Sequence, residues 1–153
     1  MITIRFAHPD DAAVLAKLRY EFRATTDADV ESMSEFLSRC ETWMRERLQQ
    51  TGWRCWVAEQ DQTIVGALWL QLIEKIPNPT REAEYHGYIT NVFVSEKARQ
   101  KGIGSRLLVE AINFCKSQPV HAVILWPSER SRSLYERHGF AVRSDVLTMS
   151  DML

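Results

Sequence analysis

The chain has 153 residues, 45% of them hydrophobic and 25% charged, which fits one domain over residues 1–153 with a sizeable core. Its formal net charge of -1 at pH 7 excludes a broadly basic surface, so we expect no nucleic-acid partner. The longest apolar run is too short to cross a bilayer and residues 1–5 lack a signal peptide's hydrophobic region, so we expect no membrane partner and a cytoplasmic location.

A strand and two helices are predicted in the first third of the chain. Residues 2–6 alternate as in a strand, and Pro9 then opens a helix. Its shared apolar face consists of Leu15, Leu18 and Phe22. A second helix is indicated by an apolar stripe, with Asp29 as its N-terminal cap and Thr51-Gly52 as its end. That stripe consists of Met33, Leu37, Cys40, Met44 and Leu48.

A β-hairpin follows, in which Gln60-Asp61-Gln62 joins two strand-like runs, residues 53–59 and 63–73. Two prolines favour a loop over residues 74–84, and strand pairing is expected to resume at Tyr85. The remaining expected elements are a strand to residue 94, a helix over 107–115, a strand over 120–126, a short helix and a final strand over 141–149. This alternation predicts an α/β domain with a mixed sheet.

The three cysteines give no sign of a disulfide framework or a zinc site. Cys40, Cys55 and Cys115 are odd in number and lack Cys-x-x-Cys spacing. Each lies in an apolar pattern, so we predict small core residues and no metal site.

The stretch Arg99-Gln100-Lys101-Gly102-Ile103-Gly104-Ser105 lies between an apolar strand and an amphipathic helix. The first turn of a helix leaves about four N–H groups without internal partners and carries partial positive charge. Gly102 and Gly104 allow a phosphate to approach the main chain closely, and Lys97, Arg99 and Lys101 add positive charge. We therefore predict a diphosphate-binding site here. The alternative is a glycine-bearing connection that simply starts a surface helix.

Two common phosphate motifs do not fit this stretch. Gly102 is not followed by the Gly-Lys-Ser/Thr ending of a Walker loop, and position 107 is Leu where Gly-x-Gly-x-x-Gly requires glycine. The stretch instead resembles the acetyl-CoA signature of the GCN5-related N-acetyltransferase (GNAT) superfamily, as Arg99-x-x-Gly102-x-Gly104 after Val92-Phe93-Val94. A second family segment is similar to Leu134-Tyr135-Glu136-Arg137-His138-Gly139-Phe140. The element order agrees with the superfamily over essentially the whole chain.

The resemblance implies a GNAT-like fold in which the strand before the glycine loop and the next strand splay apart to admit acetyl-CoA. Main-chain groups of Val92, Phe93 and Val94 would pair with the pantetheine arm and polarise the thioester carbonyl. The pyrophosphate would lie on the loop and first turn formed by Arg99, Gln100, Lys101, Gly102, Ile103, Gly104 and Ser105. The implied reaction is direct attack by a neutral amine, giving an acetamide and free CoA with no covalent enzyme intermediate.

Tyr135 has two readings. From the sequence alone a packing aromatic is favoured, with Gly139 ending the helix in the left-handed conformation and Phe140 folding back on the last turn. The resemblance instead implies that the Tyr135 hydroxyl lies near the cofactor sulfur and protonates the departing thiolate. Ordinary pKa values of about 10 for tyrosine and 8.5 for a thiol mean that this transfer needs modest help from the site.

Two positions depart from the family pattern. Ser128 occurs seven residues before Tyr135, where many members have an asparagine that contacts the cofactor arm; a serine can still form a hydrogen bond. No obvious general base is present, because the strand positions nearest the thioester are Tyr88 and Thr90. His86, on the same strand face, is a candidate base acting through water, the alternative being an ordinary histidine at a strand edge.

The acceptor is not identified by any motif. Five acidic residues in the segments expected to border it would favour a cationic small molecule or an amino terminus; these are Asp27, Asp29, Glu31, Glu82 and Glu84. Solvated loops are the simpler interpretation. Besides an acetyl-CoA-dependent N-acetyltransferase, a noncatalytic acyl-CoA-binding sensor and a structural domain without ligand are alternatives, although the two loop glycines argue against the last. A homodimer stays open, since no segment identifies an interface.

Overall fold

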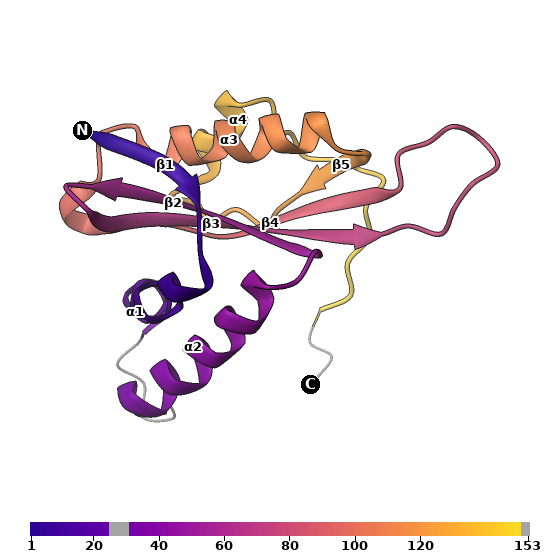
Figure 1. The fold of residues 1–153 in the computed structure, drawn as a ribbon. Helices are drawn as coiled ribbons and strands as arrows, with labels where there is room; N and C mark the ends of the chain where they lie inside the picture. Colours follow the sequence, from indigo (N-terminus) through magenta and orange to yellow (C-terminus); the bar gives the residue numbers. More distant parts are fainter. Residues whose placement is uncertain (25–30, 151–153) are drawn as a thin grey trace.

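The computed structural model describes residues 1–24 and 31–150. A five-stranded sheet lies between two layers of helices (Figure 1). In spatial order the strands are β1 (Ile2–Phe6), β2 (Trp53–Gln60), β3 (Thr63–Glu74), β4 (Tyr85–Val94) and β5 (Val120–Ile124). Neighbouring strands are antiparallel except β4 and β5, which are parallel. The predicted α/β mixed sheet is confirmed.

The helices divide between the two faces of the sheet. One face is covered by α1 (Ala12–Arg23), which follows a 3-10 turn η1 (Pro9–Asp11), and by α2 (Met33–Leu48). The other is covered by α3 (Ile103–Ser117) and α4 (Arg132–Arg137), and a second 3-10 turn, η2 (Glu96–Ala98), precedes α3. Both faces of the central strand β3 are therefore buried, as its unbroken apolar run predicts.

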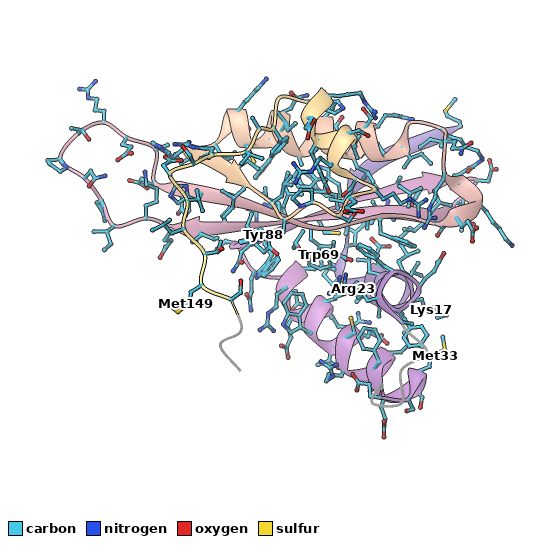
Figure 2. All side chains as sticks on the ribbon, turned by 180° about the vertical axis from the view of Figure 1, so that it is seen from behind. Lys17, Arg23, Met33, Trp69, Tyr88 and Met149 are labelled. Atoms are coloured by element: carbon cyan, nitrogen blue, oxygen red, sulfur yellow. The ribbon has the colours of Figure 1, made fainter. Side chains whose placement is uncertain are left out.

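Each face of the sheet has its own hydrophobic core. Leu68 and Leu70 point toward α3 and pack with its buried stripe, while Trp69 between them points toward α1 and α2 (Figure 2). None of these three side chains is more than 2% exposed. At about 25 cal/mol per Å² of buried apolar surface, these central positions are among the strongest contributors to folding. Cys40, Cys55 and Cys115 are free thiols buried in these cores.

Local signals set the turns and caps. Asp61 and Gln62 both have positive φ, 50° and 65°, the two-residue turn that matches the twist of a hairpin, and the predicted β2–β3 hairpin is confirmed. The predicted cap of the second helix is wrong: α2 begins after Ser32, whose Oγ accepts from the Glu35 backbone N–H while the Glu35 carboxylate accepts from the Ser32 N–H. This capping box is the stronger local signal, and Asp29 lies outside the described residues.

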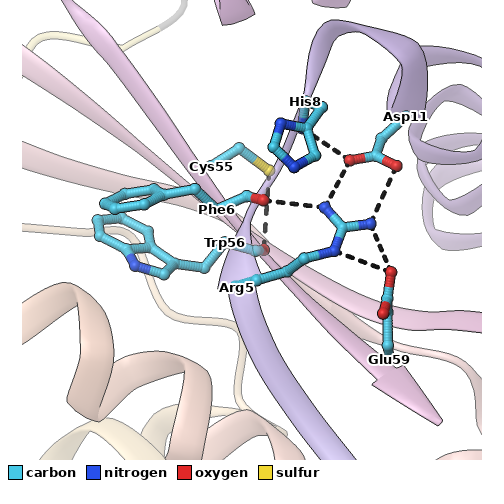
Figure 3. A network of polar contacts seen from close by, with 7 residues as sticks. All are labelled: Arg5, Phe6, His8, Asp11, Cys55, Trp56 and Glu59. Atoms are coloured by element: carbon cyan, nitrogen blue, oxygen red, sulfur yellow. Dashed lines mark hydrogen bonds and ion pairs between the residues drawn. The ribbon is translucent and has the colours of Figure 1, made fainter. Parts of the chain in front are cut away.

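A partly buried ion-pair network fixes the start of the chain against β2 (Figure 3). Arg5 donates from Nη1 to the Asp11 carboxylate at 2.8 Å and from Nε to Glu59 at 2.9 Å. Asp11 also accepts from the His8 backbone N–H at 2.7 Å. The network therefore holds the turn that leads from β1 into α1, and with it the angle at which α1 crosses the sheet.

The predicted final strand over residues 141–149 is wrong. All ten residues 141–150 are exposed and form no strand, and they run past the β5 side of the sheet toward the side of α1 and α2 (Figure 1). A turn at Ser144 and Asp145 divides the apolar positions, and Arg143 donates from Nε to Asp145 across it at 2.8 Å. The turn leaves two short pieces that form no pairing with the sheet, although the segment contains apolar residues such as Val142, Leu147 and Met149.

Across the ranges 1–24 and 31–150, no helix is both long and apolar enough to span a membrane.

Candidate active site

The main cleft opens where β4 and β5 separate. Parallel pairing extends from Tyr85↔Val120 to Tyr88↔Ile124, and beyond it the described part of β4 is paired on the β3 side alone. The free edge, residues 89–94, faces a cavity of about 800 Å³. Because unpaired strand edges present backbone N–H and C=O groups, this edge can bind an extended polar chain such as a pantetheine arm. The predicted splaying of these two strands is confirmed.

A β-bulge shapes this free edge. Trp69 of β3 is opposite Thr90, whereas Ala67 is opposite Phe93, so β4 carries one extra residue between those positions. Asn91 lies in the bulge with φ 54°, a left-handed conformation that asparagine tolerates better than most residues. Its Oδ1 accepts from Arg19 Nη1 at 3.3 Å. The bulge therefore redirects the backbone of Val92 toward the cleft, and α1 supports it from one side.

The predicted phosphate loop lies at one end of this cleft. Gly102 caps α3 with φ 73°, and Gly104 lines the cavity. A methyl group at Gly104 would meet only the Leu134 side chain at 3.5 Å, so the backbone there is open to a ligand. The first-turn amides of α3 have no partners within the helix, and the positive end of the helix dipole lies at the same place. The geometry fits a diphosphate.

Several side chains of this loop contact other parts of the protein and not the cavity. Ile103 is 2% exposed and belongs to the core, and the Ser105 Oγ lies 2.7 Å from His138 Nε2. Arg99 donates from Nε to the Val94 carbonyl at 3.0 Å and lies against the Phe93 ring while lining the cavity. Gln100 and Lys101 are exposed and are not among the described residues that line the cavity. The backbone amides and Arg99 are thus the groups that reach an anion in the cleft.

Tyr135 lies in the wall of the same cavity, in α4. It is 7% exposed, packs edge to face with Phe140 at 5.8 Å, and lines the cleft together with Ser131. Burial raises the pKa of Tyr135, and the Ser131 side chain acts in the opposite direction. The phenol is consequently protonated at neutral pH and can act as a proton donor. Gly139, with φ 92°, ends the helix in the predicted left-handed conformation.

Ser128 lines the cleft but its hydroxyl has local partners. Its Oγ lies 2.8 Å from Ser131 Oγ and accepts from the Ser131 backbone N–H at 3.2 Å. This is an N-cap interaction that starts the turn leading into α4. Ser128 therefore positions the segment that carries Tyr135.

His86 is not among the described residues that line the main cleft. Its ring packs edge to face with His121 at 5.7 Å, and its Nδ1 is buried without a partner in the described part of the chain. His121 Nδ1 lies 3.1 Å from Glu82, which also pairs with Lys75 at 3.0 Å. The histidine thus belongs to a polar cluster at the far end of β4.

The acidic residues expected around the acceptor are also elsewhere. Glu82 and Glu84 line a second, smaller cavity of about 200 Å³ in the β3–β4 loop, and Glu31 pairs with Arg39. Asp27 and Asp29 lie outside the described residues. None of these three acidic residues lines the main cleft, so the acidic approach stays a prediction.

The cleft is also lined by Arg19, Arg23, Trp126 and Arg130, which the sequence pattern did not single out. Arg19, Phe22 and Arg23 of α1 face Tyr88 of β4, Trp126 after β5, and Arg130 before α4 across the cavity. The sequence contained a signal for Arg19. It occurs four residues after Leu15 and three before Phe22, so a charged residue lies on the apolar stripe of this helix. Trp126 is 67% exposed and packs against Tyr88 at 5.3 Å.

Comparison with known proteins agrees with this geometry. Residues 20–140 match the model of the acetyltransferase (GNAT) family. The chain is 27% identical to a probable N-acetyltransferase of Mycobacterium tuberculosis, over 96% of this chain and 84% of that protein. It is 26% identical to an uncharacterized N-acetyltransferase of Bacillus subtilis, over 91% and 89% of the two chains.

Solved structures show the same fold. A GCN5-related N-acetyltransferase from Ralstonia eutropha superposes with a TM-score of 0.79 at 22% identity, covering 98% of this chain and 99% of that one. A predicted acetyltransferase with acetyl-CoA from Clostridium acetobutylicum has the same TM-score and identity, with 98% and 96% covered. The match to the family model, residues 20–140, extends from the last turn of α1 past the end of α4. The chain therefore belongs to the acetyltransferase (GNAT) family and is an acetyl-CoA-dependent N-acetyltransferase.

Proposed function

We propose that this chain transfers the acetyl group of acetyl-CoA to a primary amine of a small molecule or peptide by direct attack, without a covalent enzyme intermediate. The observation that carries the proposal is one continuous cleft that joins the free edge of β4, the start of α3 and Tyr135. An extended acyl-CoA needs these three features together: a strand edge for its amides, bare backbone for its diphosphate and a proton donor beside its sulfur.

In this proposal the cofactor lies along β4 with its diphosphate at Gly102 and Gly104. Main-chain groups of Val92, Phe93 and Val94 hold the arm and orient the thioester carbonyl at the bulge. Arg99 adds positive charge near the diphosphate, while the side chains of Ile103 and Ser105 support the loop from behind. Backbone amides aimed at the carbonyl oxygen would stabilise negative charge that develops there during attack.

Tyr135 acts at the leaving group. The amine nitrogen forms a bond to the carbonyl carbon, the bond from that carbon to sulfur breaks, and the sulfur takes a proton from the Tyr135 hydroxyl. The attacking nitrogen loses its extra proton to solvent as the neutral acetamide forms, and the phenolate is reprotonated from solvent. Burial raises the pKa of Tyr135 and so keeps the phenol protonated until the thiolate forms. The hydrogen bond with the Ser131 side chain acts to lower that pKa.

The test is release of free thiol from acetyl-CoA in the presence of a panel of primary amines. We expect Tyr135→Phe to lower kcat by about 100-fold or more, with acetyl-CoA affinity within about threefold of wild type, because one proton donor is lost and no binding group changes. Tyr20→Phe is the matched control, since Tyr20 packs against Phe36 outside the main cleft. Wild-type activity in Tyr135→Phe would remove Tyr135 from this role.

The predicted cytoplasmic location is part of the proposal. All three cysteines are free and buried, as is usual for proteins of a reducing compartment.

A further inference from the structure

Arg19 occupies an unusual position for a guanidinium. It projects from the buried face of α1 into the wall of the main cleft, half-buried, and donates to Asn91 Oδ1 at 3.3 Å. None of the ion pairs formed by the described residues includes it. Burial lowers the pKa of Arg19 and the nearby Arg23 adds to this effect, but a guanidinium remains charged at neutral pH. A partly desolvated cation without a carboxylate is costly unless a ligand supplies the anion.

The surroundings of Arg19 are positive as well. Arg23 of α1, Arg99 after β4 and Arg130 before α4 line the same cleft. Glu21 is the one carboxylate among the cleft residues that the structure describes, and it is directed to the Ser95 hydroxyl at 3.4 Å. The remaining titratable groups facing the cavity are the phenols of Tyr88 and Tyr135. The cleft therefore favours anions at both ends.

Arg19 contacts the cleft at the bulge of β4 and not at the phosphate loop. Its partner Asn91 is in the bulge, whereas Gly104 is beyond the last residue of β4. With the cofactor diphosphate at Gly102 and Gly104, the acyl end of the arm reaches the bulge, and the space around Arg19, Tyr88 and Trp126 is left for the acceptor.

We propose that the acceptor is a small amine that also carries an oxyanion, carboxylate or phosphate, and that Arg19 binds this oxyanion. Asn91 holds Nη1, which leaves Nε and Nη2 of the guanidinium to donate to two acceptor oxygens. The edge-to-face pair of Tyr88 and Trp126 forms the neighbouring wall against which the carbon skeleton packs. The inference rests on the proposed function, because it assigns the substrate class to the same cleft.

The positive field has a catalytic consequence. The attacking amine must be neutral, and nearby positive charge lowers the pKa of an ammonium group. Arg19 and Arg23 would thus favour the reactive form of the amine while the oxyanion of the same molecule offsets the repulsion. This explains how the reaction proceeds although no imidazole lines the cleft in the described part of the chain.

The experiment compares amines with and without the anion, and each kcat/KM is referred to the concentration of neutral amine, because removing the anion also changes the pKa of the ammonium group. The pairs are glycine with glycinamide, β-alanine with β-alaninamide, and phosphoethanolamine with ethanolamine, each assayed by thiol release from acetyl-CoA. We expect at least one anionic member to exceed its neutral partner in kcat/KM by about 10- to 100-fold, the range expected for hydrogen bonds to a charged group. The first two pairs identify a carboxylate and the third a phosphate. Equal or better activity of every neutral partner would overturn the inference.

Arg19→Gln tests the residue itself. The variant is expected to lose this preference through a higher KM for the anionic amine, while the neutral partner changes by about threefold or less. If Arg19 only supported the bulge, both members of a pair would fall together and acetyl-CoA would bind more weakly. Arg39→Gln is the matched control, because Arg39 lies on α2 outside the main cleft with its side chain 68% exposed.

Binding separates this inference from the proposed function. The same six amines are titrated by calorimetry into the wild type and Arg19→Gln, each saturated with CoA. If an anionic amine binds and its binding requires Arg19, the oxyanion site is supported, even when no amine releases thiol. Absence of thiol release would count against the proposed acetyl transfer alone. Binding that is absent, or equal in the two proteins, overturns the oxyanion site whatever the thiol assay gives.

Discussion

Ser105 Oγ and His138 Nε2 lie 2.7 Å apart, and this contact joins the first turn of α3 to the residue that caps α4. One element offers backbone amides at the cleft, and the other carries Tyr135. The hydroxyl of Ser105 is therefore occupied within the protein, while the open backbone at Gly104 remains for a ligand. This division of roles leads to a pair of variants with opposite effects.

Gly104→Asp is expected to weaken acetyl-CoA binding by about 10-fold or more, because a carboxylate would lie beside the diphosphate site. The fold should tolerate the change: the added Cβ meets only Leu134 at 3.5 Å, and aspartate is favourable in the first turn of a helix. Calorimetric titration with acetyl-CoA measures the affinity, and thermal unfolding without ligand checks the fold.

Ser105→Ala is the control for that variant. Loss of the hydrogen bond to His138 should lower the free energy of unfolding by about 1 kcal/mol, with acetyl-CoA affinity within about twofold of wild type. Should Ser105→Ala weaken binding as much as Gly104→Asp, the hydroxyl and not the backbone would be the binding group.

His86→Gln addresses the general base predicted from the strand pattern. Because His86 packs against His121 outside the main cleft, we expect kcat and its dependence on pH to remain within about twofold of wild type. Steady-state rates between pH 6 and 9 provide the measurement, and His121→Gln is the matched control. Loss of the rise in rate with pH in His86→Gln alone would show that His86 accepts the proton through water.

The places of the glycine loop and of Tyr135 along the chain, and the element order as far as α4, were predictable because each depends on local sequence. Gly102 marks a left-handed helix cap and Gly139 a helix end, and both have positive φ in the structure. The apolar spacing of Leu107, Leu108 and Ala111 similarly fixes which face of α3 is buried. These features can be predicted because they depend on residues that are close together in the sequence.

The acceptor side was not predictable in the same way. The contact between Arg19 and Asn91 joins residues 72 positions apart, and it depends on the angle of α1 over the sheet and on a one-residue bulge. His86 shares a strand face with Tyr88. However, β4 pairs with β5 as far as Tyr88, so the cleft opens only after that residue and His86 lies outside it. Alternation shows which face a side chain occupies, not where neighbouring strands separate.

Asp11→Asn should destabilise the protein at pH 7 by about 1–2 kcal/mol, since Asp11 accepts charge-assisted hydrogen bonds from Arg5. Burial acts to raise the pKa of Asp11, but the bonds from Arg5 and the His8 N–H outweigh it and the net pKa is lowered. A lowered pKa in the folded state contributes stability that is full above the unfolded value, about 3.9, and is lost as pH falls through the folded value.

Urea unfolding at several pH values measures this effect. The difference between wild type and Asp11→Asn should be constant from pH 7 to about 5 and shrink toward pH 3. Asp10→Asn is the matched control. Asp10 is fully exposed and its ion pair with Arg45 is long, at 3.6 Å, so its loss should change the free energy of unfolding little. A difference that persists unchanged at pH 3 would mean that packing, not charge, is lost in Asp11→Asn.

The segment after Phe140 tests how far an alternating apolar pattern can be trusted. Val142 is 83% exposed and Leu147 95% exposed, so the double variant Val142→Thr with Leu147→Ser should change the free energy of unfolding by less than about 0.5 kcal/mol. Val57→Thr is the matched control: Val57 is fully buried in β2, and placing a hydroxyl there should cost about 1–3 kcal/mol. Urea unfolding at low protein concentration measures both. A loss above about 1 kcal/mol in the double variant would mean that these side chains are buried in solution, as the predicted strand requires.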